Sequence, residues 1–334
     1  MRTHPPSHGL SRRQFLGAAG ALGCLAGLPA WSAPVQDWPQ PLFDYLASLA
    51  RPDGGYGWPE QDRSHLTATW AVVGCHQLFQ RPLPRPEALA VCVRASHPQQ
   101  GRKPEYALQQ FDFQQVQTLR WLGDKAEDFH ARFQAWTRPV VYPRQYESTG
   151  NPPLPQTVSA VLGRALLGLP LADATPAYGP YLAQRCRANG SFNHLPAAEG
   201  GDGHAVVTWW ALQTGQALGG EVRQPQTLMD WLRQCQLPNG GFTWQPKPAL
   251  AGMEDVTYTW AAVHSLQLLG SQPRDVDACR RHLWSLWHPT GGFSDRPGWQ
   301  PNPVATYYAL SALAILAALT PPAPLVRQTA PPPP

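Results

Sequence analysis

Apolar side chains recur at every third or fourth position over much of the chain, a period that predicts helices. In residues 255–269, DVTYTWAAVHSLQLL, this spacing places Val256 and Trp260 on one face of a helix. Residues 225–236, PQTLMDWLRQCQ, show the same period, and Pro225 stands at the first position, where a helix tolerates proline. The pattern therefore predicts a chain built from helices.

A short motif with one or two glycines and an aromatic residue recurs along the chain. Its clear copies are PDGGYGW at 52–58, RANGSF at 187–192, PNGGFTW at 238–244 and PTGGFSD at 289–295. The last three copies lie roughly 50 residues apart, and a period of this size marks a repeat array. The longer gap before them has room for two degenerate copies, which we place near Gly101 and Gly150. The sequence thus predicts six units.

Each unit places one helix before the glycine motif and one after it. The preceding helices are expected at residues 40–50, 85–96, 125–137, 176–188, 225–236 and 275–287. The following helices are expected at residues 65–80, 112–122, 156–168, 204–218, 255–269 and 303–318. The following set is nearly uncharged, and a helix that is apolar all round is buried. We therefore expect an all-α (α/α)6 toroid, with six helical hairpins in two concentric rings. An open solenoid of stacked hairpins is the alternative.

The composition fits one large domain, and the charge balance bears on which classes of partner the protein can bind. The chain is 43% hydrophobic and carries a formal charge of +4. Without Arg2, Arg12 and Arg13, however, 23 basic side chains face 22 acidic ones. A nearly neutral chain gives no electrostatic footprint for nucleic acid, so no nucleic-acid partner is expected. None of the six cysteines forms a CxxC pair, which favours small buried apolar groups over a zinc knuckle.

The two ends of the chain differ from the repeats. The twin arginine at 12–13 precedes an apolar run, the arrangement of a twin-arginine export signal, so residues 1–33 are expected to be a signal peptide. This predicts a periplasmic or secreted protein, and leaves open whether Cys24 is lipidated. The toroid is expected over residues 34–319, where no apolar run is long and clean enough to span a membrane. Residues 320–334 are proline-rich and predicted to be a disordered tail.

The segments NGGF…EDVTYTWAAVHSLQLLG and TGGFSD…NPVATYYALSALAIL resemble the repeats of the superfamily formed by protein prenyltransferase β-subunits and squalene cyclases. The resemblance covers all six units and is most specific in the first and the last three. It implies an (α/α)6 barrel whose inner helices frame a deep, aromatic-lined cavity. It also implies a small apolar, isoprenoid-like ligand in that cavity.

The resemblance does not extend to the zinc site of the protein prenyltransferases, which uses Asp and Cys of an Asp-x-Cys-Tyr motif and a His of the next unit. The matching run is DVTY at 255–258, so Thr257 stands at the cysteine position, and Ala305 stands at the histidine position. Neither can replace thiolate or imidazole as a ligand. The diphosphate-binding Arg and Lys positions hold Ala249 and Gly252. We therefore expect no zinc, no other cofactor and no protein prenylation by the usual mechanism.

Squalene-type cyclases use Asp-x-Asp-Asp as a proton donor. The matching run here, GMED at 252–255, holds two acids, Glu254 and Asp255, which can share a proton. A second run, DVD at 275–277, opens an outer helix and is expected to be an N-cap with a first-turn charge. Cyclisation by the standard acid is therefore not expected.

Aligning the inner helices on their aromatic residues brings polar groups to one rim of the cavity. The candidate catalytic residues at this rim are Asp62, His65, Asp202, His204, Glu254 and Asp255. Such a set suits general acid–base catalysis or a metal bound through nitrogen and oxygen. Helix capping is an equally available role for Asp202 and Asp255, and the histidines can simply lie at solvated helix ends.

Below this rim, aromatic side chains are expected to line the cavity. They are Trp70, Trp210, Tyr258, Trp260, Tyr307 and Tyr308, with Trp209 on the same set of helices. Their faces suit carbocations, apolar chains or sugar rings. Three functions stay open: an enzyme or binder of an isoprenoid-like ligand, a carbohydrate-active lyase or hydrolase with a glycan partner, and a non-catalytic binding or scaffold protein.

Overall fold

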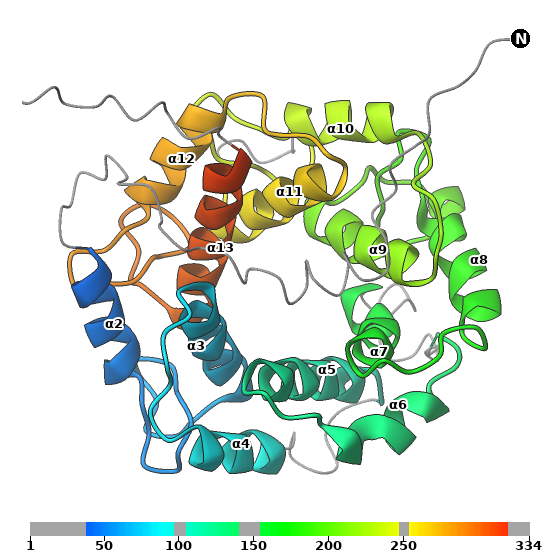
Figure 1. The fold of residues 1–334 in the computed structure, drawn as a ribbon. Helices are drawn as coiled ribbons and strands as arrows, with labels where there is room; N and C mark the ends of the chain where they lie inside the picture. Colours follow the sequence, from blue (N-terminus) through cyan, green and yellow to red (C-terminus); the bar gives the residue numbers. More distant parts are fainter. Residues whose placement is uncertain (1–37, 97–104, 140–153, 247–253, 320–334) are drawn as a thin grey trace, which may run out of the picture.

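The computed structural model describes residues 38–96, 105–139, 154–246 and 254–319, and Figure 1 shows their arrangement. The predicted signal peptide and the predicted tail lie outside the described residues. Twelve α-helices occur in the described part, with isolated β-bridges and no strand. The all-α class predicted from the sequence is confirmed.

Six helices form a closed inner ring. They are α3 (Leu66–Leu78), α5 (Glu105–Trp121), α7 (Leu154–Leu166), α9 (Ala205–Ala217), α11 (Val256–Leu268) and α13 (Pro303–Leu319). Each packs against the next in the chain, and α13 packs against α3, so the ring closes (Figure 1). The toroid is therefore confirmed, and the open solenoid is wrong.

A second set of helices surrounds this ring. They are α2 (Pro39–Ser48), α4 (Pro86–Ala95), α6 (His130–Ala135), α8 (Thr175–Arg185), α10 (Pro225–Gln234) and α12 (Val276–Ser285), with short 3-10 turns at Glu127–Phe129 and Ala197–Glu199. The predicted bounds hold to within about two or three residues except at two places. Helix α5 begins seven residues before the expected 112, and the third outer helix is reduced to a 3-10 turn and α6. The backbone of Ala126, at φ 53°, cannot join a right-handed helix at that point.

Four units fasten the glycine motif to the inner helix in the same way. In each, the backbone N–H of the motif's aromatic residue donates to a threonine one turn inside the helix, at 2.9 to 3.1 Å. The pairs are Tyr56 with Thr69, Phe192 with Thr208, Phe242 with Thr259, and Phe293 with Thr306. The carbonyl of the same aromatic residue accepts from the residue that precedes the helix. These bonds hold the N-terminal ends of α3, α9, α11 and α13 at one rim of the toroid.

The glycines of the motif are required by close backbone approach. Gly240 has a φ of +94°, and a Cβ there would lie 2.0 Å from the carbonyl oxygen of Ala278 in α12. Gly291 has the same φ, and a Cβ there would lie 2.2 Å from the carbonyl oxygen of Pro41 in α2. The second contact joins the last unit to the first, so the outer ring closes as well.

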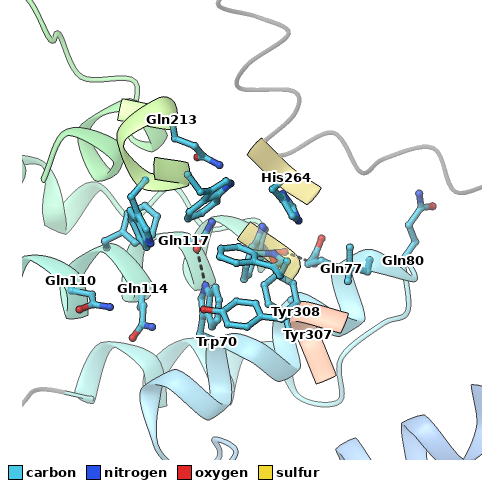
Figure 2. A pocket seen from close by; sticks show the side chains of 17 residues that line it. Trp70, Gln77, Gln80, Gln110, Gln114, Gln117, Gln213, His264, Tyr307 and Tyr308 are labelled. Atoms are coloured by element: carbon cyan, nitrogen blue, oxygen red, sulfur yellow. Dashed lines mark hydrogen bonds between the residues drawn. The ribbon is translucent and has the colours of Figure 1, made fainter. Parts of the chain in front are cut away.

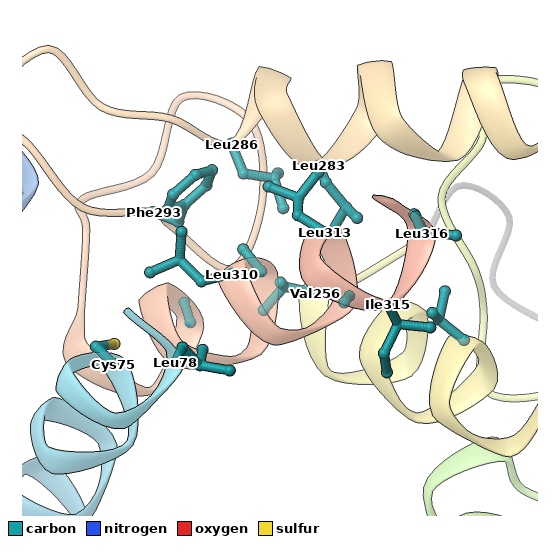
Figure 3. Packing of buried hydrophobic residues seen from close by; sticks show 14 of the residues in the cluster. Cys75, Leu78, Val256, Leu283, Leu286, Phe293, Leu310, Leu313, Ile315 and Leu316 are labelled. Atoms are coloured by element: carbon teal, nitrogen blue, oxygen red, sulfur yellow. The ribbon is translucent and has the colours of Figure 1, made fainter. Parts of the chain in front are cut away.

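The main hydrophobic core lies between the two rings. Figure 3 shows Leu283 and Leu286 of α12 and its following turn facing Leu310 and Leu313 of α13, with Phe293 beside them. All five are at most 4% exposed. Burial of this apolar area is the main force that holds an outer helix on an inner one.

The cysteines follow the expectation of small apolar groups in part. Cys75, Cys235 and Cys279 are buried, whereas Cys92 and Cys186 are half-buried, and all five are free thiols. Within the described ranges, no helix combines the length and the apolarity that a membrane span requires.

Candidate functional site

A cavity of about 360 Å³ lies inside the inner ring (Figure 2). Helices α3, α5, α9, α11 and α13 and the segment after α3 line it. Its aromatic lining consists of Trp70, Phe113, Trp121, Trp209, Trp210, Trp260, Tyr307 and Tyr308. A concave site of this size with mostly apolar walls is the common form of a small-molecule pocket.

The aromatic rings support one another. Trp260 of α11 stacks on Tyr308 of α13, with ring centroids 4.2 Å apart and an interplanar angle of 21°. On its other side Trp260 contacts Trp209 of α9 at 4.3 Å. Tyr307 packs against α3 because Gly74 has no side chain there: a Cβ would lie 2.6 Å from the tyrosine ring. The wall is thus a packed aromatic surface with little freedom to collapse into the cavity.

Five of the six aromatic residues expected at the cavity line it, and Tyr258 does not. Tyr258 precedes Trp260 by two positions, about 200° around the helix, and so points elsewhere. Its ring contacts His204 at 5.6 Å and Trp244 at 5.8 Å, at the rim. That the cavity binds a substrate stays a prediction.

Sequence reasoning missed the polar part of the lining. Six glutamines contribute to it: Gln77, Gln80, Gln110, Gln114, Gln117 and Gln213. Figure 2 shows Gln110 and Gln114 to the left of the view and Tyr307 and Tyr308 nearer its centre. The available signal was the run QQFDFQQVQ at 109–117, where glutamines recur at helical spacing within a segment that has few charges.

The cavity is electrically neutral as far as the described lining goes. No Asp, Glu, Lys or Arg is among the described lining residues. Burial lowers the pKa of His264 to about 3, so its ring is uncharged at neutral pH, and its Nε2 lies 3.3 Å from Oγ of Ser311. Burial likewise raises the pKa of Tyr307 and of Tyr308, which keeps both phenols protonated.

The predicted rim residues are not among the residues that line this cavity. The lining on α3 runs from Trp70 to Leu78, toward the C-terminal end of the helix. His65 precedes the same helix, and thirteen residues of helix separate it from Leu78, about 20 Å at 1.5 Å per residue. The rim and the centre of the toroid are therefore distinct environments.

The two rim histidines have different roles. His65 is the N-cap of α3, where its Nδ1 accepts from the backbone N–H of Thr67 at 3.2 Å. His204 precedes α9 without making a side-chain cap bond. Burial and the nearby His194 lower the pKa of His204 to about 4. Its ring lies 5.9 Å from that of His194. Neither His65 nor His204 is among the lining residues of the cavity.

Three of the predicted acids are exposed to solvent or accept hydrogen bonds from neighbouring residues. Asp62 and Asp202 are exposed. Asp202 Oδ1 accepts from the N–H of Gly203 at 2.7 Å and is not the helix cap, so that capping prediction is wrong. Glu254 Oε1 accepts from Nδ2 of Asn239 at 2.8 Å. The structure does not bring these acids together.

Charged side chains of the rim lie close together around Asp255. Its Oδ1 caps α11 by accepting from Thr257 N at 2.9 Å, so the predicted cap is confirmed, and its Oδ2 lies 3.6 Å from Nε of Arg296. Beside it, Oδ2 of Asp295 accepts from Nδ2 of Asn302 at 2.7 Å. Burial, followed by the charge of Asp255, raises the pKa of Asp295. Asp295 belongs to the glycine motif at 289–295, but the sequence predicted no role for it at the site. The sequence also did not predict that Arg296 lies beside Asp255.

The residues at the family's zinc position do not fit zinc. Thr257 and Ala305 offer no thiolate or imidazole, and both carboxylate oxygens of Asp255 already have partners, Thr257 N and Arg296 Nε. In the described ranges, no group of three or more His, Cys, Asp or Glu side chains is arranged to hold a metal ion. That the protein itself carries no zinc stays a prediction.

Comparison with known proteins fixes the class. The family model for the prenyltransferase alpha-alpha toroid domain matches residues 21–135 and 156–328, most of the chain. The protein therefore belongs to the prenyltransferase alpha-alpha toroid family, and the resemblance inferred from its repeats is confirmed.

Individual relatives are distant. The β subunit of geranylgeranyl transferase type 1 from Arabidopsis thaliana is 28% identical over 142 residues, which cover 38% of this chain and 36% of that protein, about a third of its length. The protein geranylgeranyltransferase-I of Candida albicans, solved with GGPP, matches with a TM-score of 0.55 at 16% identity, over 92% of this chain and 91% of that one. A type II terpene cyclase from Scytonema matches with a TM-score of 0.47 at 12% identity, over 92% and 98%. At these identities the structural likeness shows the fold alone.

Proposed function

We propose that this protein binds an uncharged, isoprenoid-like ligand in the cavity of its inner ring. The aromatic lining of a cavity of about 360 Å³ supports this proposal. Membership of the prenyltransferase alpha-alpha toroid family supports it at the level of ligand class. The Candida albicans relative, whose solved complex contains GGPP, adds an isoprenoid precedent on the same fold.

The observation that carries the proposal is the neutral lining. Burying a diphosphate would require cationic partners, because an isolated charge is costly to remove from water. The described lining offers tryptophans, tyrosines, amides and a neutral His264 instead. The ligand we propose is therefore a neutral derivative, such as an alcohol or a ketone, and not a prenyl diphosphate.

The proposal includes the absence of zinc-dependent prenyl transfer. It rests on Thr257 and Ala305, whose side chains cannot ligate the metal as cysteine and histidine do. Elemental analysis of the purified protein tests this point directly. Stoichiometric zinc that survives dialysis against a chelator would overturn it.

A glycan is the second candidate ligand, because the glutamines favour it. Amide side chains beside aromatic faces suit hydroxyl-rich rings as well as isoprenoid alcohols. This candidate predicts a retained or added oligosaccharide at the same cavity, whereas a scaffold protein retains neither class of ligand.

Extraction of the purified protein for mass spectrometry tests the ligand class. A lipid in the extract supports the isoprenoid proposal, and a glycan supports the second candidate. The Gln213→Trp variant fills the cavity from α9 and is expected to abolish retention. Gln226→Trp adds the same side chain to exposed α10 and serves as its control, with retention unchanged. Empty extracts, together with no binding of added farnesol or cellotetraose, contradict both proposals and leave a scaffold role.

We also propose that the protein is exported through the twin-arginine pathway. This rests on the sequence around Arg12 and Arg13, which lies outside the described residues. Changing both arginines to lysine is expected to keep the charge but retain the protein in the cytoplasm. Unchanged recovery of this variant from the periplasm or medium would contradict the proposed route.

A further inference from the structure

The side-chain amide of Gln117, which lines the cavity, is held in one orientation by a hydrogen bond from Trp70. Nε1 of Trp70 lies 2.7 Å from Oε1 of Gln117 (Figure 2). An indole N–H can only donate, so the atom that faces it must be the amide oxygen. This removes the usual ambiguity between oxygen and nitrogen in a glutamine side chain. The NH₂ group of Gln117 is therefore turned away from Trp70.

Gln114 makes a similar contact one turn earlier in α5, to a hydroxyl rather than to an indole N–H. Its Oε1 accepts from Oγ1 of Thr67 at 3.1 Å. Among the described residues, neither amide nitrogen, of Gln114 or of Gln117, has a hydrogen-bond partner, and both side chains line the cavity. Residues three apart on a helix have Cβ atoms about 5–6 Å from each other, so one oxygen atom between the two side chains can accept from both.

The other glutamines do not offer the same pair. Gln77 already donates its Nε2 to the carbonyl oxygen of Trp121 at 2.6 Å. Gln80 lies beyond the end of α3, Gln213 comes from α9, and the amide of Gln110 has no hydrogen bond among the described residues that would orient it. The α5 pair is thus distinguished by two engaged carbonyls and two NH₂ groups without partners.

We propose that Gln114 and Gln117 select ligands that carry one uncharged oxygen acceptor, such as a hydroxyl, ketone or ether, on an apolar chain. The proposal rests on the function proposed above and specifies its ligand. A pure hydrocarbon leaves both NH₂ groups without an acceptor after water has been displaced. A diphosphate supplies acceptors but brings charge into a lining that has no described cation.

Three probes with the same carbon chain test the selection: farnesol, farnesene and farnesyl diphosphate. Quenching of tryptophan fluorescence reports binding, because four tryptophans besides Trp70 line the cavity. The wild-type protein is expected to bind farnesol about tenfold or more tightly than farnesene, as two hydrogen bonds to a neutral acceptor allow. It is expected to bind farnesyl diphosphate more weakly than farnesol.

Two variants assign the selection to the amides. Gln117→Glu keeps an acceptor for Trp70 but removes the donors, and Gln114→Met removes the amide at similar length. Each removes one of the two hydrogen bonds and is expected to reduce a roughly tenfold preference for farnesol over farnesene to about threefold, with farnesene binding retained as evidence of a folded cavity. Gln226→Met makes the same change at an exposed position of α10, outside the cavity lining, and is the matched control, expected to keep the preference.

The outcomes separate this inference from the proposed function. If none of the three probes binds, the proposed function itself is contradicted, and the selection with it. If farnesol and farnesene bind equally well, or if both amide variants keep the preference, only the selection is overturned. Tighter binding of the diphosphate overturns the requirement for an uncharged group. If Gln117→Glu does not fold, Gln114→Met alone decides the matter.

Discussion

The indole N–H of Trp70 donates to the side-chain oxygen of Gln117 at 2.7 Å, across the boundary between α3 and α5. The two residues are 47 positions apart, and the same separation recurs between Thr67 and Gln114. His264 and Ser311, 47 positions apart, join α11 to α13 in the same manner. The repeat period thus places matched polar pairs between neighbouring inner helices.

Trp70→Phe is expected to lower the free energy of unfolding by about 1–3 kcal/mol, because the amide oxygen of Gln117 loses its donor inside the cavity wall. Urea denaturation followed by circular dichroism measures this loss. Trp299→Phe is the control, since Trp299 is 54% exposed, and its effect should stay within about 0.5 kcal/mol. Equal losses in the two variants would contradict a role for the Trp70 bond.

The architecture could be predicted from the sequence because it depends on features that repeat. The glycine motifs set the period, and the contrast between charged and uncharged helices assigned them to the two rings. The start of α5 was missed because the unit around Gly101 lacks the double glycine and aromatic residue that mark a boundary elsewhere. The count of six units favoured a closed ring, but repeats alone also fit an open solenoid. The contact between α13 and α3 establishes that the ring closes.

The cavity was predicted less completely, for geometric reasons. The register on Trp70 and Trp260 identified aromatic positions but could not say which polar side chains of α5 turn inward. The rim acids were placed at the correct end of the helices, yet the lining begins a turn further along and runs toward the other end. Asp295 and Arg296 come from a loop, where no helical period shows which side chains approach Asp255.

Thr259→Val is expected to destabilise the protein by about 1–3 kcal/mol, because the buried N–H of Phe242 would lose its acceptor. Valine has nearly the shape of threonine, so the change isolates the hydroxyl. That hydroxyl also donates to the carbonyl oxygen of Asp255 at 3.0 Å.

Thr257→Val is the matched control on the same helix, because no hydrogen bond of its hydroxyl occurs among the described residues, and Thr257 is half-buried. Denaturant midpoints of both variants provide the comparison. A loss for Thr257→Val as large as that for Thr259→Val would show that the repeated threonine bond is not what stabilises the motif.

Gly240→Ala is expected to cost on the order of 3 kcal/mol or more, and to reduce the yield of folded protein. The added Cβ would lie 2.0 Å from the carbonyl oxygen of Ala278, a backbone atom that cannot rotate away. Gly270→Ala shares the strain of a positive φ, at +66°, but has open space around the new atom. It should cost only about 1–2 kcal/mol. Thermal unfolding of the two variants separates the clash from the strain, and equal melting temperatures would contradict the clash.

Asp295→Asn is expected to stabilise the protein at neutral pH, and the gain should disappear in acid. Burial, and then the charge of Asp255, raises the pKa of Asp295. The folded state therefore holds this proton more tightly than the unfolded state, and stability falls as the pH rises from about 3.9 through the raised pKa. Asparagine has no charge to bury, so the variant avoids that loss.

Asp53→Asn should show the opposite sign and serves as the control. Burial raises the pKa of Asp53, but the hydrogen bonds donated by Ser64 and Gly55 outweigh it and leave the pKa below its ordinary value. Its contribution is present above the ordinary pKa and is lost as the pH falls through the lowered one. Unfolding free energies are measured from pH 7 to pH 3. At pH 7 we expect Asp295→Asn to be more stable than wild type and Asp53→Asn to be less stable. Both differences should shrink as the pH falls. A loss of stability at pH 7 in Asp295→Asn would show instead that its charge is needed at the rim, beside Arg296.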